Sequence, residues 1–190
     1  MTLHIVRHGR TEANASGLLL GRADPGLDPI GRTQADKIAS WLGRPDRLVS
    51  SPLRRCMETA EAFGVEIEAD DRAIELDYGD FDLTPVRDVP AEVWREWRRD
   101  PTFRPPGGET LVELQVRVGE LLDELAADAI DRDVVVLTHV SPVKASMAWA
   151  LGVGAEVSWR SFVAQASITT IGVTANGPSL RSFNSEHHLG

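Results

Sequence analysis

The sequence has little cysteine and no long apolar run. Cys56 is the only cysteine among 190 residues, so no disulfide can form within the chain. A single thiol fits a reducing compartment, and we expect a cytoplasmic protein. No segment approaches the roughly 20 consecutive apolar residues of a membrane-spanning helix. Arginines stand near the N-terminus where a signal peptide would need its apolar centre.

Positive charge is also scarce. The chain has 20 basic and 29 acidic residues, for a formal net charge of -9. A nucleic acid or an anionic membrane is therefore not an expected partner. Internal repeats and low-complexity linkers are absent from the sequence, and its length suits one domain spanning residues 1–190. A homodimer is allowed, although nothing in the sequence indicates one.

Short apolar runs alternate with segments of helical period, which predicts an α/β fold. The run at 133–138 is rich in β-branched residues, as expected for a strand buried on both faces of a sheet. We therefore expect a three-layer α/β/α arrangement around a mostly parallel central sheet. The predicted strands are 3–6, 48–51, 133–138, 167–174 and 180–183, and the predicted helices are 29–42, 52–63, 110–127 and 142–151.

Three of the predicted helices open with the same kind of dipeptide. These are Asp28-Pro29, Ser51-Pro52 and Ser141-Pro142. Each joins a good N-cap side chain to a proline at the first helical position, where the missing N–H costs nothing. We expect these three helices to begin there.

Polar residues follow three of the predicted strands. They are Arg7-His8-Gly9, Ser50-Ser51 and Thr138-His139. The carboxyl ends of parallel strands share one edge of a sheet, where ligands bind in such folds. We expect these residues to be neighbours there, with Gly9 allowing the backbone to approach a ligand.

A phosphoryl group is the ligand that these residue types fit best. Guanidinium groups offer fixed positive donors for phosphate oxygens. Arg7 ends the first strand, Arg55 lies in the helix after the second, and His139 ends the third. Thr11 and Asn14 add neutral donors near the first of these.

His8 is the candidate nucleophile of such a site. A neutral imidazole attacks phosphorus without first losing a strongly held proton, and covalent catalysis divides one difficult step into two. A carboxyl group must then protonate the leaving group and later deprotonate water. Glu75 is our candidate for that role, with Asp77 and Asp80 close enough in sequence to compete.

Seven segments together carry a resemblance that spans essentially the whole chain. RHGRTEAN at 7–14 is similar to the RHGxTxxN signature of the histidine phosphatase superfamily, the phosphoglycerate-mutase-like proteins. Further matching segments follow in the family's order. They are GLDPIGRTQA (26–35), SSPLRRCMETA (50–60), ELDYG (75–79), PGGET (106–110), VVVLTHV (134–140) and FNSEHHL (183–189).

The resemblance implies a phosphoglycerate-mutase-like fold and a metal-free, cofactor-free site. It implies that Arg7, Arg55 and His139 hold the phosphate, that His8 becomes phosphorylated and that Glu75 transfers protons. The further substrate contacts that it implies are Thr11, Asn14, Gly21 and Val140.

Two positions place the chain within the superfamily. The acid-phosphatase branch reads RHGxRxP and has aspartate after its second histidine. Here Thr11 and Val140 stand at the discriminating positions, which favours the mutase-and-phosphatase branch. That branch usually has glycine where Val140 stands and an aromatic followed by Glu-Gly where residues 80–83 stand, so substrate specificity cannot be taken from the family average.

Other motifs are better explained by structure than by chemistry. A cysteine phosphatase would need arginine six residues after Cys56, where Ala62 stands. GLDPIGRT (26–33) superficially fits a phosphate-binding loop but follows no strand and contains Pro29. His4, His187 and His188 form no metal-ligand pattern.

The segment 80–108 is expected to border the site entrance. Trp94 and Trp97 within it are expected to dock on the core, on a helix whose other face is solvated. In the alternative, arginines such as Arg98 and Arg104 bind a second anionic group of the substrate.

A phosphomonoesterase acting on a small phosphorylated metabolite is the predicted function. A cofactor-dependent phosphoglycerate mutase is the alternative, although a mutase must exclude water with covering segments. Acidic residues in the loop that leads into the entrance segment would also repel a bisphosphate primer if that loop borders the entrance: Asp77, Asp80, Asp82 and Asp88. A second alternative is a non-catalytic domain that binds a phosphorylated ligand or a partner protein.

Overall fold

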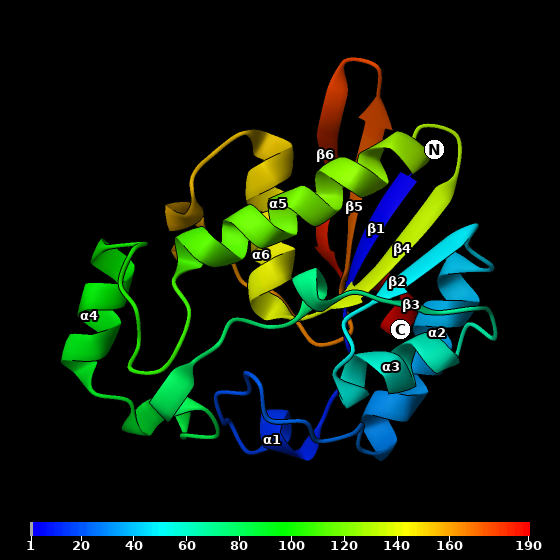
Figure 1. Ribbon diagram of the computed structural model, residues 1–190. Coiled ribbons are helices and arrows are strands. Elements are labelled where there is room, and N and C mark those ends of the chain that lie inside the picture. Colours follow the sequence, from blue (N-terminus) through cyan, green and yellow to red (C-terminus); the bar gives the residue numbers. More distant parts are fainter. Residues whose placement is uncertain (1) are drawn as a thin grey trace.

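A six-stranded sheet forms the centre of the computed structural model, which describes residues 2–190 (Figure 1). Its strand order is β3-β2-β4-β1-β5-β6. The first four strands in that order run parallel, whereas β5 pairs antiparallel with both β1 and β6. The strands are β1 (Thr2–Arg7), β2 (Arg47–Ser50), β3 (Glu68–Ala69), β4 (Asp133–Thr138), β5 (Ile168–Thr174) and β6 (Gly177–Ser185).

Helices cover both faces of the sheet (Figure 1). Side chains alternate along β1, so Leu3 and Ile5 pack in the apolar cluster of α5 and α6, while Val6 packs in that of α2 and α3. The longer helices are α2 (Pro29–Leu42), α3 (Arg54–Glu61), α4 (Ala91–Arg99), α5 (Leu111–Asp128) and α6 (Val140–Leu151). The shorter ones are α1 (Glu12–Ala15) and the 3₁₀ helices η1 (Asp71–Ala73), η2 (Gly79–Phe81), η3 (Val86–Asp88), η4 (Ala155–Arg160) and η5 (His187–Leu189).

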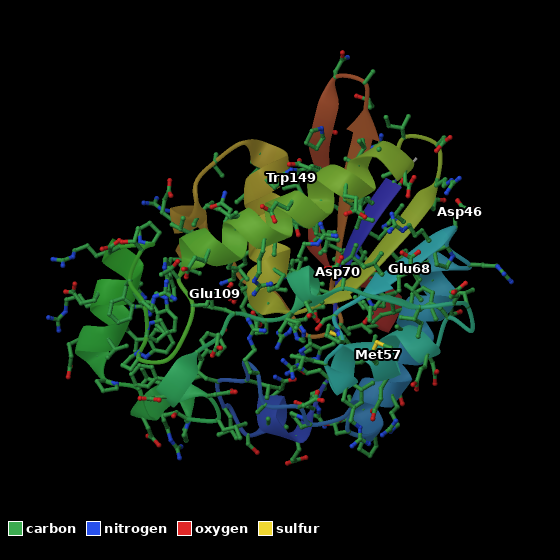
Figure 2. All side chains as sticks on the ribbon, viewed as in Figure 1. Asp46, Met57, Glu68, Asp70, Glu109 and Trp149 are labelled. Atoms are coloured by element: carbon green, nitrogen blue, oxygen red, sulfur yellow. The ribbon has the colours of Figure 1, made fainter. Side chains whose placement is uncertain are left out.

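The predicted α/β class and mostly parallel sheet are confirmed. The sequence analysis missed β3, because its two residues are both exposed and carry no apolar pattern. An ion pair of 2.8 Å between Arg47 on β2 and Glu68 helps to hold this edge strand. Glu68 is labelled in Figure 2. No helix within residues 2–190 combines the length and apolarity needed to cross a membrane.

The predicted start of α2 is confirmed. The Asp28 carboxylate accepts from the N–H of Gly31 at 2.7 Å, and Pro29 is the first helical residue. The predicted start of α3 was wrong, since the helix begins at Arg54 after Leu53, which makes no side-chain cap. The Ser51 hydroxyl instead lies between a histidine ring and the N–H of Leu53.

The predicted start of α6 was wrong by two residues. The helix begins at Val140, so Pro142 is its third residue. The first N–H groups of the helix, at Val140 and Ser141, donate to the carboxylate of Glu75. A carboxylate from another segment thus replaces the predicted serine cap.

The α4 region agrees with the prediction of a docked helix. Trp97 is only 1% exposed and belongs to the apolar cluster beneath α5 and α6. Arg104 is held by the carbonyl oxygen of Gly108 at 2.9 Å and by the carboxylate of Glu113. Its guanidinium is therefore already engaged within the protein.

Candidate active site

The carboxyl ends of β1, β2 and β4 meet at one edge of the sheet. The N–H of His8, just beyond β1, donates to the carbonyl oxygen of Thr138 at the end of β4 at 2.9 Å. The ring centroids of His8 and His139 lie 5.1 Å apart, with an interplanar angle of 62°. The sheet therefore joins the residues that the sequence placed at three separate strand ends.

The His8 ring has a defined tautomer. Its Nδ1 lies 2.7 Å from the carbonyl oxygen of Gly9, and a carbonyl only accepts, so Nδ1 carries the proton. Nε2 is left with its lone pair. Burial lowers the pKa of His8 well below its usual value, and the positive charges of Arg55 and Arg7 lower it further. The ring is therefore neutral, with an unprotonated Nε2.

The His139 ring has the opposite tautomer. Its Nδ1 lies 3.1 Å from Nε of Arg55, which can only donate, so the proton of His139 is on Nε2. Nε2 lies 2.8 Å from the Ser51 hydroxyl oxygen. Burial and then the charge of Arg55 lower the pKa of His139 well below its usual value. The N–H of this neutral imidazole therefore donates to the Ser51 hydroxyl oxygen.

Arg55 is fully buried and held on three sides. Besides His139, its guanidinium donates to the carbonyl oxygens of Ala23 and Gly21, each at 2.8 Å. The N–H of Gly21 in turn donates to the Asp82 carboxylate at 2.8 Å. Both polar backbone groups of Gly21, a predicted substrate contact, are thus engaged in holding this arginine.

Asp82 is a supporting residue that the sequence analysis did not identify. Its carboxylate accepts from the N–H groups of Gly21, Arg22 and Ala23 at 2.7 to 2.9 Å. It thereby fixes the loop whose carbonyl groups bind Arg55. The sequence analysis treated Asp82 only as part of an acidic entrance, because its backbone partners lie some 60 residues away.

The short helix α1 accounts for Thr11 and Asn14. Thr11 is fully buried and caps α1, accepting from the N–H of Asn14 at 3.2 Å. The Oδ1 atom of Asn14 accepts from both the N–H and the hydroxyl of Thr11. The amide nitrogen of Asn14 remains as a donor. Asn14, unlike Thr11, lines the cavity described below.

Gly9 allows a close approach of another backbone segment, not the predicted approach of a ligand. A Cβ at this position would lie 2.4 Å from the carbonyl oxygen of Gly31, at the start of α2. The missing side chain therefore allows the backbones of two segments to approach each other. This corrects the expectation that Gly9 leaves room for a ligand.

Glu75 lies at the N-terminus of α6. Its carboxylate accepts from the N–H groups of Val140 at 3.0 Å and Ser141 at 3.1 Å, and from that of Leu76 at 2.7 Å. Helix N-termini favour negative charge. The N–H of Val140, a predicted substrate contact, is engaged with Glu75. The competing Asp77 accepts instead from the N–H of Gly79 at 2.9 Å.

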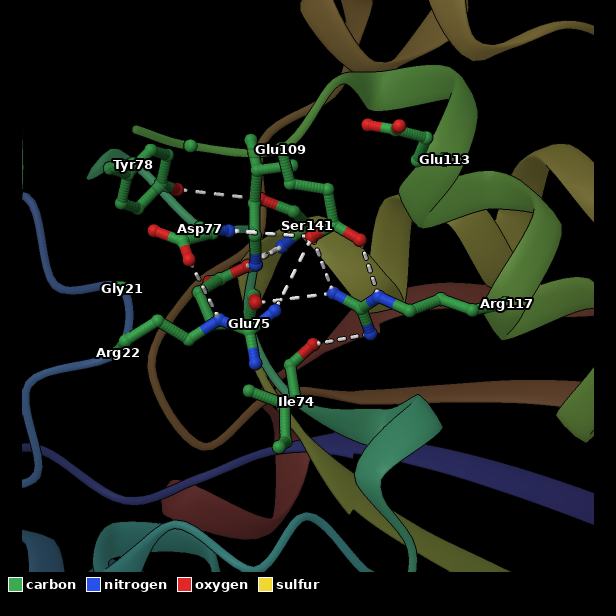
Figure 3. A network of polar contacts seen from close by, with 12 residues as sticks. Gly21, Arg22, Ile74, Glu75, Asp77, Tyr78, Glu109, Glu113, Arg117 and Ser141 are labelled. Carbon is green, nitrogen blue, oxygen red and sulfur yellow. Dashed lines mark hydrogen bonds and ion pairs between the residues drawn. The ribbon is translucent and has the colours of Figure 1, made fainter. Parts of the chain in front are cut away.

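Arg117 on α5 fixes the backbone around Glu75 (Figure 3). It donates to the carbonyl oxygens of Ile74 at 2.8 Å and Glu75 at 3.1 Å. Both oxygens of Glu109 pair with this guanidinium at 2.7 and 2.9 Å. The sequence analysis missed Arg117, since it stands among other polar residues of an amphipathic helix.

A cavity of about 180 Å³ joins several of these residues. Arg7 lines it and donates from Nη1 to the carbonyl oxygen of Val163 at 2.8 Å. Its Nε is buried without a hydrogen-bond partner among residues 2–190. The lining residues are Arg7, His8, Asn14, Leu18, Leu19, Leu20, Glu75, Tyr78 and Val140.

The cavity thus combines a neutral imidazole, a guanidinium and a carboxylate. Arg55 and His139 do not line it, although the His139 ring lies 5.1 Å from that of His8. No group of three or more metal-ligating side chains occurs within residues 2–190. The arrangement suits attack on a group that carries negative charge.

Relatives of known sequence match nearly the whole chain. Three mycobacterial proteins, one named a bifunctional protein of Mycobacterium tuberculosis, are 31% identical over 198 residues. This chain spans about half their length, 54%, with 98% of its own residues covered. Phosphoserine phosphatase 1 of Hydrogenobacter thermophilus is 33% identical over 198 residues, covering 99% of this chain and 94% of its own.

Solved structures resemble the whole fold. A phosphoserine phosphatase mutant from Entamoeba histolytica, in complex with phosphoserine, superposes with a TM-score of 0.92 at 25% identity, covering 100% of this chain and 99% of its own. A mycobacterial glucosyl-3-phosphoglycerate phosphatase with VO3 gives 0.87 at 30% identity, covering 97% and 99%. The model of the histidine phosphatase superfamily (branch 1) matches residues 3–186, and the chain therefore belongs to that family.

Proposed function

We propose that the protein is a phosphomonoesterase that hydrolyses a small phosphorylated metabolite through a phosphohistidine at His8. One observation carries the proposal: the cavity that His8 lines also contains Arg7 and Glu75. A free Nε2 lone pair, a fixed cation and a carboxyl group are the three functions that phosphoryl transfer to histidine requires. Relatives named as phosphatases support the same reaction class.

The first half-reaction transfers the phosphoryl group to the protein. Arg7 and the amide nitrogen of Asn14 bind phosphoryl oxygens while Nε2 of His8 attacks phosphorus. The P–N bond forms as the bond to the ester oxygen breaks. Glu75, in its protonated form, gives its proton to that oxygen, so the product leaves as a neutral alcohol.

The second half-reaction returns the site to its starting state. Glu75, now a carboxylate, accepts a proton from water as the water oxygen attacks phosphorus. The P–N bond breaks, inorganic phosphate forms and the lone pair returns to Nε2. The charge of Arg55 adds positive potential near His8, and His139 helps to position that guanidinium.

We further propose that residues 80–108 border the entrance within a single 1–190 domain. Trp94 and Trp97 from this segment line a second cavity next to that of His8. Small metabolites are the proposed substrates, since known relatives bear the names of enzymes for phosphoserine and a glycerate-derived phosphate. A cytoplasmic location is part of the same proposal.

Phosphate release in the presence of EDTA tests this function. The panel would contain an aryl phosphate, phosphoglycerates and phosphoserine, with wild type beside His8→Ala. The exposed His187→Ala is the matched control. We expect release from wild type and His187→Ala and a loss of about a thousandfold or more in His8→Ala, as for a removed nucleophile.

Rapid quenching into alkali should also trap a phosphorylated wild-type protein, but not a phosphorylated His8→Ala. Conversion of 3-phosphoglycerate to 2-phosphoglycerate without net release would replace the proposal with a mutase. Silence in both assays, together with binding of phosphate esters, would replace it with a non-catalytic binding domain.

A further inference from the structure

A second cavity, of about 100 Å³, adjoins the cavity of His8. The two share Leu19, Tyr78 and Val140 as lining residues. A phosphate ester bound at His8 would therefore extend its alcohol portion toward the second cavity. The side chains that line the second cavity therefore decide which alcohol portion fits.

Three tryptophans form one wall of the second cavity. Trp97 stacks on Trp94 with ring centroids 5.7 Å apart and contacts Trp159 edge-on at 6.0 Å. The indole N–H groups of Trp97 and Trp159 are buried without a hydrogen-bond partner among residues 2–190. Buried donors without acceptors are rare in folded proteins. Both donors belong to residues that line this cavity.

Lys144 is the cation that lines the same cavity. It is one of only two lysines in the sequence and lies one helical turn after Val140 on α6. Its ammonium donates to the carbonyl oxygen of Ser158 at 2.9 Å, which uses one of three N–H donors. No carboxylate within residues 2–190 comes within ion-pair distance of it. Burial lowers the pKa of Lys144, while the charge of Glu75 raises it.

The arginines of this region do not fill the same role. Arg98 lies over the rings of Trp94 and Trp159, 5.9 Å from each centroid, and does not line the cavity. Arg104 is engaged by Glu113. A cation without a counter-ion and two unpartnered N–H groups thus surround a small space that no carboxylate of residues 2–190 lines.

We propose that Lys144, together with the indole N–H groups of Trp97 and Trp159, binds a carboxylate of the substrate's alcohol portion. The preferred substrates are then phosphate esters of short hydroxy acids. The small volume and the aromatic wall favour a three- or four-carbon acid over one that also carries a sugar. The inference deepens the proposed function and rests on it, since it places the ester phosphorus at His8.

Matched substrate pairs test the carboxylate requirement. 3-Phosphoglycerate and glycerol 3-phosphate differ only by a carboxylate in place of a hydroxymethyl group, and phosphoserine differs from phosphoethanolamine by its carboxylate. We expect wild type to prefer the acid in at least one pair, with the difference expressed mainly in KM.

Lys144→Met should lower kcat/KM for the preferred acid about 10- to 100-fold. For the substrate of the pair that lacks the carboxylate, kcat/KM should stay within about threefold of wild type. Lys144→Arg should restore part of the preference. Trp159→Phe, which keeps the ring but removes the N–H, should reduce the preference less. Lys37→Met is the control, because Lys37 is exposed on α2 and binds the carbonyl oxygen of Leu189.

A binding measurement separates this inference from the proposed reaction. A protein with isotope-labelled lysine should give two side-chain NMR signals, which Lys37→Met would assign. Glycerate, which has no phosphate, should shift the Lys144 signal and leave that of Lys37 unchanged. This shift in a protein without phosphatase activity would support the carboxylate site while refuting the proposed function.

Three results would overturn the carboxylate site. The first is an active wild-type protein that does not prefer the carboxylate-bearing substrate in either pair. The second is an equal loss for both members of a pair in Lys144→Met. The third is a Lys144 signal that glycerate does not move at concentrations well above the KM of the preferred acid.

Discussion

His8 and His139 lie with ring centroids 5.1 Å apart and carry their protons on opposite nitrogens. The carbonyl oxygen of Gly9 assigns the proton of His8 to Nδ1, whereas Nε of Arg55 assigns that of His139 to Nε2. One ring therefore presents a lone pair and its neighbour an N–H donor. Both rings must remain neutral for this arrangement to persist.

The free energy of unfolding should fall as the pH falls below about 6.5. Histidine in an unfolded chain titrates near 6.5, whereas burial holds the folded pKa values of His8 and His139 well below that value. The unfolded state then binds more protons than the folded state. We expect a loss of about 1 kcal/mol per histidine between pH 6.5 and 5.5, measured by urea denaturation.

A substitution isolates the contribution of one ring. His8→Asn, whose new side chain does not titrate, should remove about 1 kcal/mol of this pH-dependent loss, while the exposed His187→Asn should leave it unchanged. A free energy of unfolding that stays constant or rises over this interval would show that the two rings are not held neutral.

Replacement of Arg117 by methionine should impair proton transfer more than binding. Arg117 holds the carbonyl oxygens of Ile74 and Glu75, so its loss should displace the Glu75 carboxyl group. An aryl phosphate has a good leaving group that needs little protonation, whereas an alkyl phosphate needs it. We expect kcat/KM to fall about 10- to 100-fold for the alkyl ester and several-fold less for the aryl ester.

Arg99→Met is the control for that experiment, since Arg99 pairs with Glu96 on the exposed side of α4. Equal losses for the two esters in Arg117→Met would mean that the guanidinium supports the fold in general. Glu75 would then not be its specific target.

Asp82→Asn should weaken the hold on Arg55 without touching the cavity. Asparagine would turn an NH₂ group toward backbone N–H groups of Gly21, Arg22 or Ala23, which now all donate to the carboxylate. We expect a loss of about 1 to 3 kcal/mol in the free energy of unfolding. We also expect kcat/KM to fall about tenfold or more, as the carbonyl groups holding Arg55 shift.

The neighbouring Asp80→Asn removes the same charge from an exposed side chain. It should leave both measurements close to wild type. If both substitutions lower kcat/KM equally, the negative charge of the segment and not the loop geometry would be responsible.

Gly9→Ala should destabilise the protein strongly. The added Cβ would meet the backbone carbonyl oxygen of Gly31 at 2.4 Å, and backbone cannot move aside as a flexible side chain can. We expect a loss of several kcal/mol in the free energy of unfolding, about 3 or more, typical of overpacking against backbone. Thermal denaturation would check this, with Gly64→Ala as a contrast.

At Gly64 no atom lies within 4 Å of an added Cβ, although its positive φ of 62° adds strain. Gly64→Ala should therefore lower the free energy of unfolding by only about 1 kcal/mol. A Gly9→Ala protein no less stable than Gly64→Ala would refute the close approach of the two backbones.

Local patterns in the sequence were enough to predict the α/β class, most strands of the sheet and the polar residues that gather at its edge. The β-branched run of β4 and the helical periods around it required only neighbours a few positions away. The same holds for α2, where Asp28 and Pro29 act on the adjoining turn. Strand ends share one sheet edge whatever the details of packing, so the meeting of His8 and His139 followed from topology.

Tertiary structure decided the features that depend on distant partners. Glu75 caps α6 from 65 residues away, which moved the start of that helix ahead of Ser141-Pro142. Asp82 and Arg117 act through backbone groups of other segments, so no spacing along the chain reveals them. The close approach at Gly9 likewise depends on Gly31 in α2. The sequence by itself determined which chemical groups stand at the sheet edge, and folding decided how each is oriented and held, because hydrogen bonds and contacts depend on distance in space.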